Sequence, residues 1–189
     1  MIDRNIPCSA ISPSPNDAAR YQRPRGTFTG VRFTVGLPFL ENHSDPTAAP
    51  TPLNMTSMFW TWQYGYRFFT LDVTVTPKPD ETARPHGFPV HLGSTGCESV
   101  SATEAPRKEC SAPNLVTVTL PNFDPSQQTV KLDIRQILAT SDVSTNQPKT
   151  APGCMSDPDD QDCKGIFQAF GLPFGSETSP PAQSVFRGR

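Results

Sequence analysis

The sequence lacks the signals of several common protein classes. It has no apolar run approaching the roughly 18 to 20 residues that a membrane-spanning helix needs, and its start has no apolar signal-peptide core. The formal net charge is only -2 and the charges are interspersed, so no basic stripe is available for nucleic acid or an anionic membrane. Phosphate loops and dinucleotide fingerprints are absent. We therefore expect a soluble protein that does not bind polyanions.

Long helices are also excluded by composition. The chain has 22 prolines and 12 glycines in 189 residues, and each proline removes an amide donor and fixes its backbone angle. With 35% hydrophobic residues the chain is still long enough to bury one sizeable core. One compact domain rich in turns is the expected result.

Short stretches of alternating apolar and polar residues predict β-strands between proline- and glycine-rich turns. One amphipathic helix is expected over 159–170, because acidic residues precede an apolar stripe and Gly171 can end it. The sequence thus predicts a mainly β protein, a β-sandwich with long Pro/Gly-rich loops and one short C-terminal helix. Residues 1–26 read as an irregular N-terminal arm, the remainder of a longer N-terminal portion, and 27–189 as the domain. The expected strands cover residues 30–35, 69–75, 88–92, 115–120 and 129–134, with a helical turn over 135–138.

Aromatic residues concentrate in one run, residues 58–69, which holds both tryptophans, Trp60 and Trp62. In one extended strand, every second residue from 58 to 68 would line the same face. The apolar parity switches after Phe68, so we expect a bulge or a strand break between Gly65 and Phe69. The run is either a large core strand or the wall of a metal site.

Four of the five cysteines form two local pairs, Cys97 with Cys110 and Cys154 with Cys163. Each pair flanks a polar loop with no core of its own, which favours two disulfides and an extracytoplasmic setting. A zinc site built from the four thiolates is the alternative, although neither pair has the tight spacing of a zinc knuckle. Cys8 is left over, either as a free thiol or as half of a disulfide whose partner lies in sequence not present here.

Two of the three histidines are candidate ligands. His43 lies in a polar loop, and His91 occupies the strand face opposite its apolar neighbours. Neutral imidazole binds copper, zinc and iron well, and two imidazoles with a weak third donor suit Cu(I). An exposed surface position is the alternative for each. Ser94 lies near His91, but it lacks the strand-turn-helix context of a nucleophile elbow.

An ordered set of motifs resembles the MbnP-like family, the methanobactin-associated copper proteins, also called metallo-mystery-pair four-Cys proteins. They are similar to the copper-repressible surface protein CorA of methanotrophs. The match runs through most of the chain from about residue 21. The motifs are Tyr21, GVRFTVGLPF from Gly30, ENHSD around His43, PLN ending at Asn54, MFWTWQYGY ending at Tyr66, HLGSTGC from His91, PN ending at Asn114, PGCMS around Cys154 and QSVFR ending at Arg187.

The resemblance implies a periplasmic or surface-associated bacterial protein that binds one copper ion and is not an enzyme. The family site consists of two histidines and a tryptophan oxidised to kynurenine by a MauG-like di-haem cytochrome c peroxidase. His43 and His91 match the family histidines, and the kynurenine position is Trp60 or Trp62. The four family cysteines match the two pairs described above. Family members usually carry an exported N-terminal portion ahead of Cys8.

Two other functions remain open from the residues. The aromatic row could be a stacking platform in a carbohydrate- or peptide-binding sandwich, which requires Trp60 and Trp62 to face solvent. A copper redox enzyme is the third reading, and it would need an open coordination position.

Overall fold

The computed structural model describes residues 28–76 and 86–189. The predicted arm over 1–26, which includes Cys8, and residues 77–85 lie outside the described residues. In chain order the elements are β1 (Gly30–Val35), α1 (Phe39–Asn42), the 3-10 turn η1 (Thr56–Met58), β2 (Phe59–Thr61), β3 (Gly65–Val75), β4 (His86–Gly93), β5 (Val116–Pro121), β6 (Val130–Leu132), α2 (Ile134–Leu138), α3 (Gln161–Phe170) and β7 (Phe186–Gly188).

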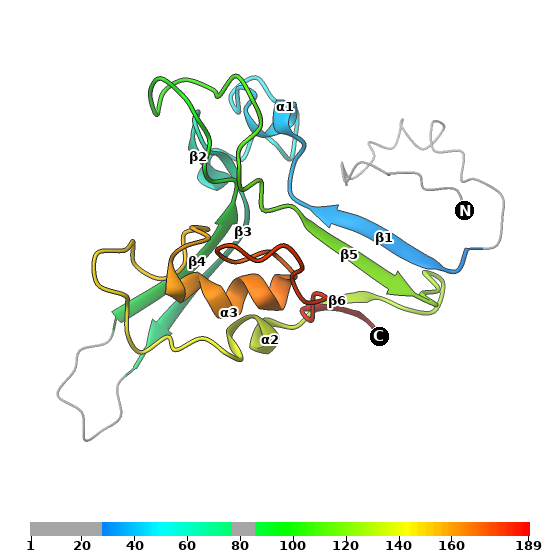
Figure 1. The fold of residues 1–189 in the computed structure, drawn as a ribbon. Helices are drawn as coiled ribbons and strands as arrows, with labels where there is room; N and C mark the ends of the chain where they lie inside the picture. The colour runs from blue at the N-terminus through cyan, green and yellow to red at the C-terminus, as the bar shows by residue number, and fades with distance from the viewer. Residues whose placement is uncertain (1–27, 77–85) are drawn as a thin grey trace.

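Within the described residues the strands form three small antiparallel sheets, β1 with β5, β2 with β3 and β4, and β6 with β7. Figure 1 shows α3 lying beside the long β3 and β4 strands, while α1 and β2 gather near one end of that pair. The predicted mainly β class with a C-terminal helix is confirmed. None of the helices in the described part of the chain is long and apolar enough to cross a bilayer.

The β3 and β4 strands divide their side chains between two faces. Phe88, Val90 and Leu92 of β4 are buried, and Phe69 and Leu71 of β3 pack against the same core. The pairing register shifts between Arg67 and Phe69, which confirms the predicted irregularity. His91, opposite Thr70, therefore lies on the other face, away from the core, because side chains alternate along a strand.

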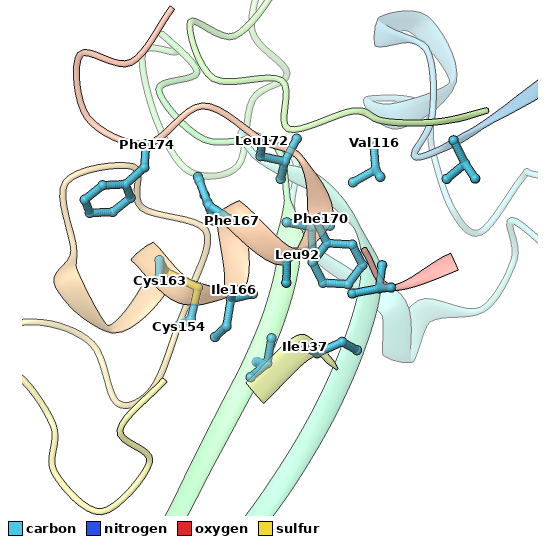
Figure 2. Close-up of a cluster of buried hydrophobic side chains, with 14 of the residues drawn as sticks. Leu92, Val116, Ile137, Cys154, Cys163, Ile166, Phe167, Phe170, Leu172 and Phe174 are labelled. Atoms are coloured by element: carbon cyan, nitrogen blue, oxygen red, sulfur yellow. A yellow bond between two sulfur atoms is a disulfide. The ribbon is translucent and has the colours of Figure 1, made fainter. Parts of the chain in front are cut away.

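Helix α3 begins and ends as its sequence predicts. The Asp160 carboxylate accepts a hydrogen bond from the Asp162 amide at 3.0 Å, which satisfies a donor at the open N-terminus. Gly171 ends the helix in the left-handed region, with φ of 71°. In the core cluster of Figure 2, the helix contributes apolar side chains that face Leu92 of β4.

Both predicted disulfides are present, Cys97 with Cys110 and Cys154 with Cys163. The second joins the start of α3 to the segment around residue 154, as the yellow bond in Figure 2 shows. The main chain of that segment also pairs with β4: the Cys154 amide donates to Pro89, and the His91 amide donates to Cys154, both at 2.9 Å. The backbone of His91 is thus held from two sides, by β3 and by residue 154.

The strand predicted over 129–134 is shorter in the structure because Asp133 caps a helix. Its carboxylate accepts from the Arg135 amide at 3.1 Å, so β6 ends at Leu132 and α2 begins at Ile134. The partner strand β7, near the C-terminus, has no counterpart among the predicted strands. It is only three residues long, too short for an alternating pattern to be recognised.

Replacement of Phe167 by Ala is expected to lower the free energy of unfolding by about 3 to 5 kcal/mol, because the ring is fully buried and its loss leaves a cavity. Urea denaturation with the disulfides intact measures the change. Leu40→Ala is the control, since Leu40 is 77% exposed and its truncation should change the value by about 0.5 kcal/mol or less. Equal unfolding midpoints for the two variants would contradict the placement of the core.

Candidate metal-binding site

The two tryptophans lie at a tight reversal of the chain. Trp60 belongs to β2, residues 62–64 form a turn, and β3 begins at Gly65. Gly65 has φ of 75°, and a Cβ there would lie 2.6 Å from the amide carbon of Asn42, so both conformation and space favour glycine. The expectation of one continuous aromatic face over 58–68 is therefore wrong, because the chain turns back between the tryptophans and β3.

The rings of Trp60 and Trp62 point to opposite sides of this reversal. Trp62 contacts Phe59 edge-on, with ring centroids 5.7 Å apart, whereas Trp60 contacts Tyr64 at 6.4 Å. Phe59 and Trp60 are neighbours in a strand, so their side chains leave on opposite faces. Both indoles are only partly exposed. This arrangement disfavours the stacking-platform reading, which needs the two rings in one solvent-facing row.

Trp60 lies beside His91. Their ring centroids are 6.2 Å apart and the ring planes are inclined by 57°. The indole also covers Gly93, where an added Cβ would lie only 2.8 Å from Trp60 Cζ3 and 2.8 Å from the carbonyl oxygen of Tyr66. The absence of a side chain at Gly93 thus lets the indole approach the end of β4.

The two ring nitrogens of His91 differ in their contacts with the rest of the described structure. Nε2 lies 3.5 Å from a carboxylate oxygen of Asp72, a side chain that is 81% exposed. A carboxylate only accepts hydrogen bonds, so this contact favours the tautomer with the proton on Nε2 and the lone pair on Nδ1. Nδ1 is buried and has no hydrogen-bond partner among the described residues. A buried lone pair without a donor is unusual and suits a metal ligand.

The charges around His91 oppose protonation of the ring. Burial lowers the pKa of His91 below its ordinary value, and the nearby Arg67 guanidinium lowers it further. Asp72 acts in the other direction, by its charge and its contact with Nε2. The neutral imidazole, the form that binds metals, is therefore favoured.

His43 follows α1 and is held in a similar way. Nδ1 lies 3.1 Å from the carbonyl oxygen of Trp62, which can only accept, so Nδ1 carries the proton. Nε2 therefore has the lone pair, and it faces the Asn42 amide nitrogen at 3.3 Å and Cys110 Sγ at 3.7 Å. Burial lowers the pKa of His43, although the hydrogen bond to Trp62 partly offsets this effect. A histidine anchored through one nitrogen to a carbonyl is a common arrangement for metal ligands.

A buried polar network connects the segment of His43 to the end of β4. The Asn42 amide nitrogen lies 3.3 Å from Ser94 Oγ and 3.2 Å from the carbonyl of Tyr64, and its oxygen accepts from the Tyr66 amide at 2.8 Å. Ser94 in turn donates to Pro113 at 3.0 Å. The serine is thus a structural link, and the nucleophile reading is disfavoured because its hydroxyl is committed to a carbonyl.

A second part of the network surrounds the main chain of His91. Ser156 Oγ donates to the carbonyl of His91 at 2.7 Å and accepts from the Gly93 amide at 2.9 Å. Asn114 donates to the carbonyl of Gly93 at 2.8 Å and to that of Ser156 at 3.2 Å. These bonds fix the main chain of His91 and of Gly93, the glycine that the Trp60 ring covers.

His43 also belongs to a cluster with the Cys97 and Cys110 sulfurs. Among the described residues this is the one group of three or more histidine, cysteine or acidic residues whose ligand atoms all lie within 4.8 Å of one another. Both sulfurs are bonded to each other, so neither is a thiolate in this structure. The two disulfides also overturn the alternative of a zinc site built from four thiolates.

Comparison with known proteins places this architecture in a family. The sequence model of the MbnP family matches residues 11–156. The chain belongs to the MbnP family. The solved structure of MbnP from Methylosinus trichosporium is similar, with a TM-score of 0.71 and 35% sequence identity over 87% of this chain and 64% of that one. Among curated proteins none matches the chain. The chain spans 64% of the length of the Methylosinus protein.

Several residues that shape this MbnP-family site escaped the sequence reasoning. Asp72 is an exposed residue, and only the register of β3 and β4 brings its carboxylate to His91. Asn42, Asn114 and Ser156 are common polar residues, and only folding shows that they are buried. Asn114 and Ser156 have positive φ values, of 51° and 63°. Asparagine adopts this region more readily than most residues and serine does not, so only Asn114 has a weak signal for it in the sequence. Whether His43 and His91 share one ion stays a prediction.

Metal-free protein is expected to lose stability as pH falls through the ordinary histidine range. The folded-state pKa values of His43 and His91 are lowered, so the unfolded chain binds protons first and the free energy of unfolding decreases on acidification. The contribution is complete above the unfolded pKa and is lost as pH falls toward the folded one. Urea denaturation between about pH 7.5 and about pH 5 measures it.

The His91→Gln variant is the matched test of that pH dependence. Glutamine keeps a polar side chain but does not titrate, so the decline in stability over this interval should be shallower than in the wild type. An unchanged slope, or stability that rises on acidification, would show that burial does not suppress protonation of His91.

Proposed function

We propose that this MbnP-family protein binds one copper ion through His43, His91 and a group derived from Trp60, and that it acts in copper acquisition, storage or delivery and not as an enzyme. The observation that carries the proposal is Nδ1 of His91, which is buried beside the Trp60 ring and has no hydrogen-bond partner within residues 28–76 and 86–189. Such an atom needs a donor or a cation, because an unsatisfied buried acceptor is unfavourable.

The donor set suits copper better than the harder divalent cations. Each imidazole has one nitrogen facing an oxygen acceptor, which leaves a lone pair on the other nitrogen, Nδ1 in His91 and Nε2 in His43. Imidazoles favour copper, zinc and iron, whereas calcium and magnesium require clustered oxygen ligands. Two imidazoles with a weak third donor suit Cu(I).

Trp60 is the better candidate for modification. Its ring faces His91, whereas Trp62 packs its ring on Phe59 and uses its carbonyl to hold His43. Opening an indole breaks its C2–C3 bond, and an oxygen atom is added to each carbon to give N-formylkynurenine. Hydrolysis then releases C2 as formate and leaves a ketone and an aniline amine. Two equivalents of hydrogen peroxide are the oxidant: they supply the two added oxygen atoms, take up the four electrons that the indole loses and leave two waters, with a MauG-like di-haem partner as the catalyst. The product would place a weak donor next to His91.

The expected location is outside the cytoplasm, in the periplasm or on the outer surface. The two disulfides support this proposal, because such bonds persist in oxidising compartments. The family assignment supports it as well. Storage or delivery agrees with a site that binds the ion through neutral ligands and can release it to a stronger acceptor.

Copper titration of the purified protein should give one tightly bound Cu(I). His91→Ala and His43→Ala should each weaken binding by about tenfold or more, since even the outer partners of metal ligands contribute that much to affinity. The measurement is competition against a Cu(I) chelator under anaerobic conditions. His86→Ala is the control, because His86 is exposed and contacts the Val143 carbonyl at 3.3 Å.

Equal affinity in the wild type and all three histidine variants would remove both imidazoles from the site. Peptide mapping of protein produced with the di-haem partner gives an independent result. Modification is expected at Trp60, and modification at Trp62 alone would overturn the choice between the two tryptophans.

A further inference from the structure

The disulfide beside His43 has the composition of a second, latent metal site. His43 Nε2 lies 3.7 Å from Cys110 Sγ, and the ligand atoms of His43, Cys97 and Cys110 all lie within 4.8 Å of one another. All three residues are buried. Imidazole and two thiolates form a donor set that selects soft cations such as Cu(I), or Zn(II).

The distance between His43 Nε2 and Cys110 Sγ already matches that between two ligands of one metal ion. With metal–nitrogen bonds of about 2.0 Å and metal–sulfur bonds of about 2.3 Å, ligands at tetrahedral or trigonal angles lie about 3.5 to 3.8 Å apart. The 3.7 Å between Nε2 and Cys110 Sγ falls in this interval. To complete the site, the two sulfurs would have to separate from each other, and Cys97 Sγ, which lies within 4.8 Å of Nε2, would have to reach the cation.

The chain around the disulfide would hold the cysteines in place after the bond opens. Thr95 and Ala112 exchange two main-chain hydrogen bonds, at 2.8 and 3.1 Å, just outside the cysteines. The Ser111 amide also donates to Gly96 at 3.1 Å, and Gln63 donates to the carbonyl of Cys97 at 2.8 Å. These bonds do not depend on the sulfur–sulfur bond.

We propose that reduction of Cys97–Cys110 creates a site for one soft cation, ligated by both thiolates and His43 Nε2. A dithiol or a phosphine supplies two electrons, the sulfur–sulfur bond breaks, and two protons give two thiols. The cation then displaces both thiol protons. The proposal rests on the proposed function only through His43. Because Nε2 has a single lone pair, it can serve one cation at a time, and the state of the disulfide selects which set of ligands uses it.

The other disulfide does not offer the same chemistry. Cys154 and Cys163 are packed in the apolar core with Ile166 and Phe167, as Figure 2 shows, and no histidine of the described residues contacts their sulfurs. Reduction of Cys154–Cys163 would leave two thiols surrounded by apolar side chains, without an imidazole to complete a metal site. The location of the imidazole therefore distinguishes the two pairs.

The test uses Co(II) as a probe, with the full chain carrying Cys8→Ser to remove the leftover thiol. The protein is reduced with tris(carboxyethyl)phosphine, freed of the reductant, and titrated anaerobically with Co(II). Alkylation and mass spectrometry identify which cysteines are free. The reduced protein should gain a thiolate-to-cobalt charge-transfer band with one Co(II) bound, and the oxidised protein should show none. Cys97→Ser/Cys110→Ser should show no band in either state.

Several outcomes would overturn the proposal. They are a charge-transfer band that persists in the double serine variant, free thiols at Cys154 and Cys163 while Cys97–Cys110 stays bonded, or no band in reduced protein whose circular dichroism is unchanged. Loss of the folded spectrum on reduction would also overturn it, because the main-chain hydrogen bonds between Thr95 and Ala112 must hold the two cysteines in place.

Two histidine variants separate this site from the copper site. His91→Ala should keep the reduced-state cobalt band, while His43→Ala should weaken Co(II) binding to the reduced protein by about tenfold or more. The two proposals can therefore be judged separately. The copper titration can contradict the copper site while the Co(II) results support the latent site, and the Co(II) results can contradict the latent site while the copper titration supports the copper site. Equal Co(II) affinity of reduced wild type and reduced His43→Ala would remove the imidazole from the latent site.

Discussion

The antiparallel pairing of β3 with β4 is the constraint on which the site depends. Because side chains alternate across the pair, a single register buries Val90 and Leu92 and leaves His91 and Asp72 on the opposite face. A slip of one residue would exchange these faces. The apolar core that α3 builds against β4 therefore also fixes the position of the candidate ligand.

The orientation of both histidines follows from oxygen acceptors on neighbouring segments. The Asp72 carboxylate faces one nitrogen of His91, and the Trp62 carbonyl faces one nitrogen of His43. Each contact selects a tautomer and leaves the other nitrogen with its lone pair. The short stretch that holds both tryptophans thus contributes a ring to one histidine and a carbonyl to the other. Residues 60–62 of this MbnP-family chain therefore contact both histidines from one short segment.

The two disulfides close loops of similar length but lie in different surroundings. Cys154–Cys163 belongs to the core and attaches α3 to the segment that pairs with β4. Cys97–Cys110 lies against His43. Opening the first would disturb packing around buried aromatic rings, whereas opening the second would place two sulfur ligands beside an imidazole. Their surroundings therefore favour a structural role for Cys154–Cys163 and a chemical role for Cys97–Cys110.

Much of the secondary structure could be predicted from patterns among residues close in sequence. Alternation predicted β1, the second part of β3, β4 and β5, and capping residues predicted α3, because these features act between residues close in sequence. Spacing alone paired the cysteines correctly. The reversal at residues 62–64 was missed, since the aromatic run looks equally regular as one strand, and β7 was too short to give a signal.

The sequence by itself determined the mainly β class, the buried and exposed faces of β1, β4 and β5, and the identities of the candidate ligands, since these depend on residue type and short-range periodicity. Only the tertiary structure decided that Trp60 meets His91, that Trp62 orients His43 and that one disulfide lies beside an imidazole. Those contacts join segments far apart in the chain, and their geometry is set by strand register and by buried hydrogen bonds of Asn42, Asn114 and Ser156. No local pattern encodes such long-range contacts.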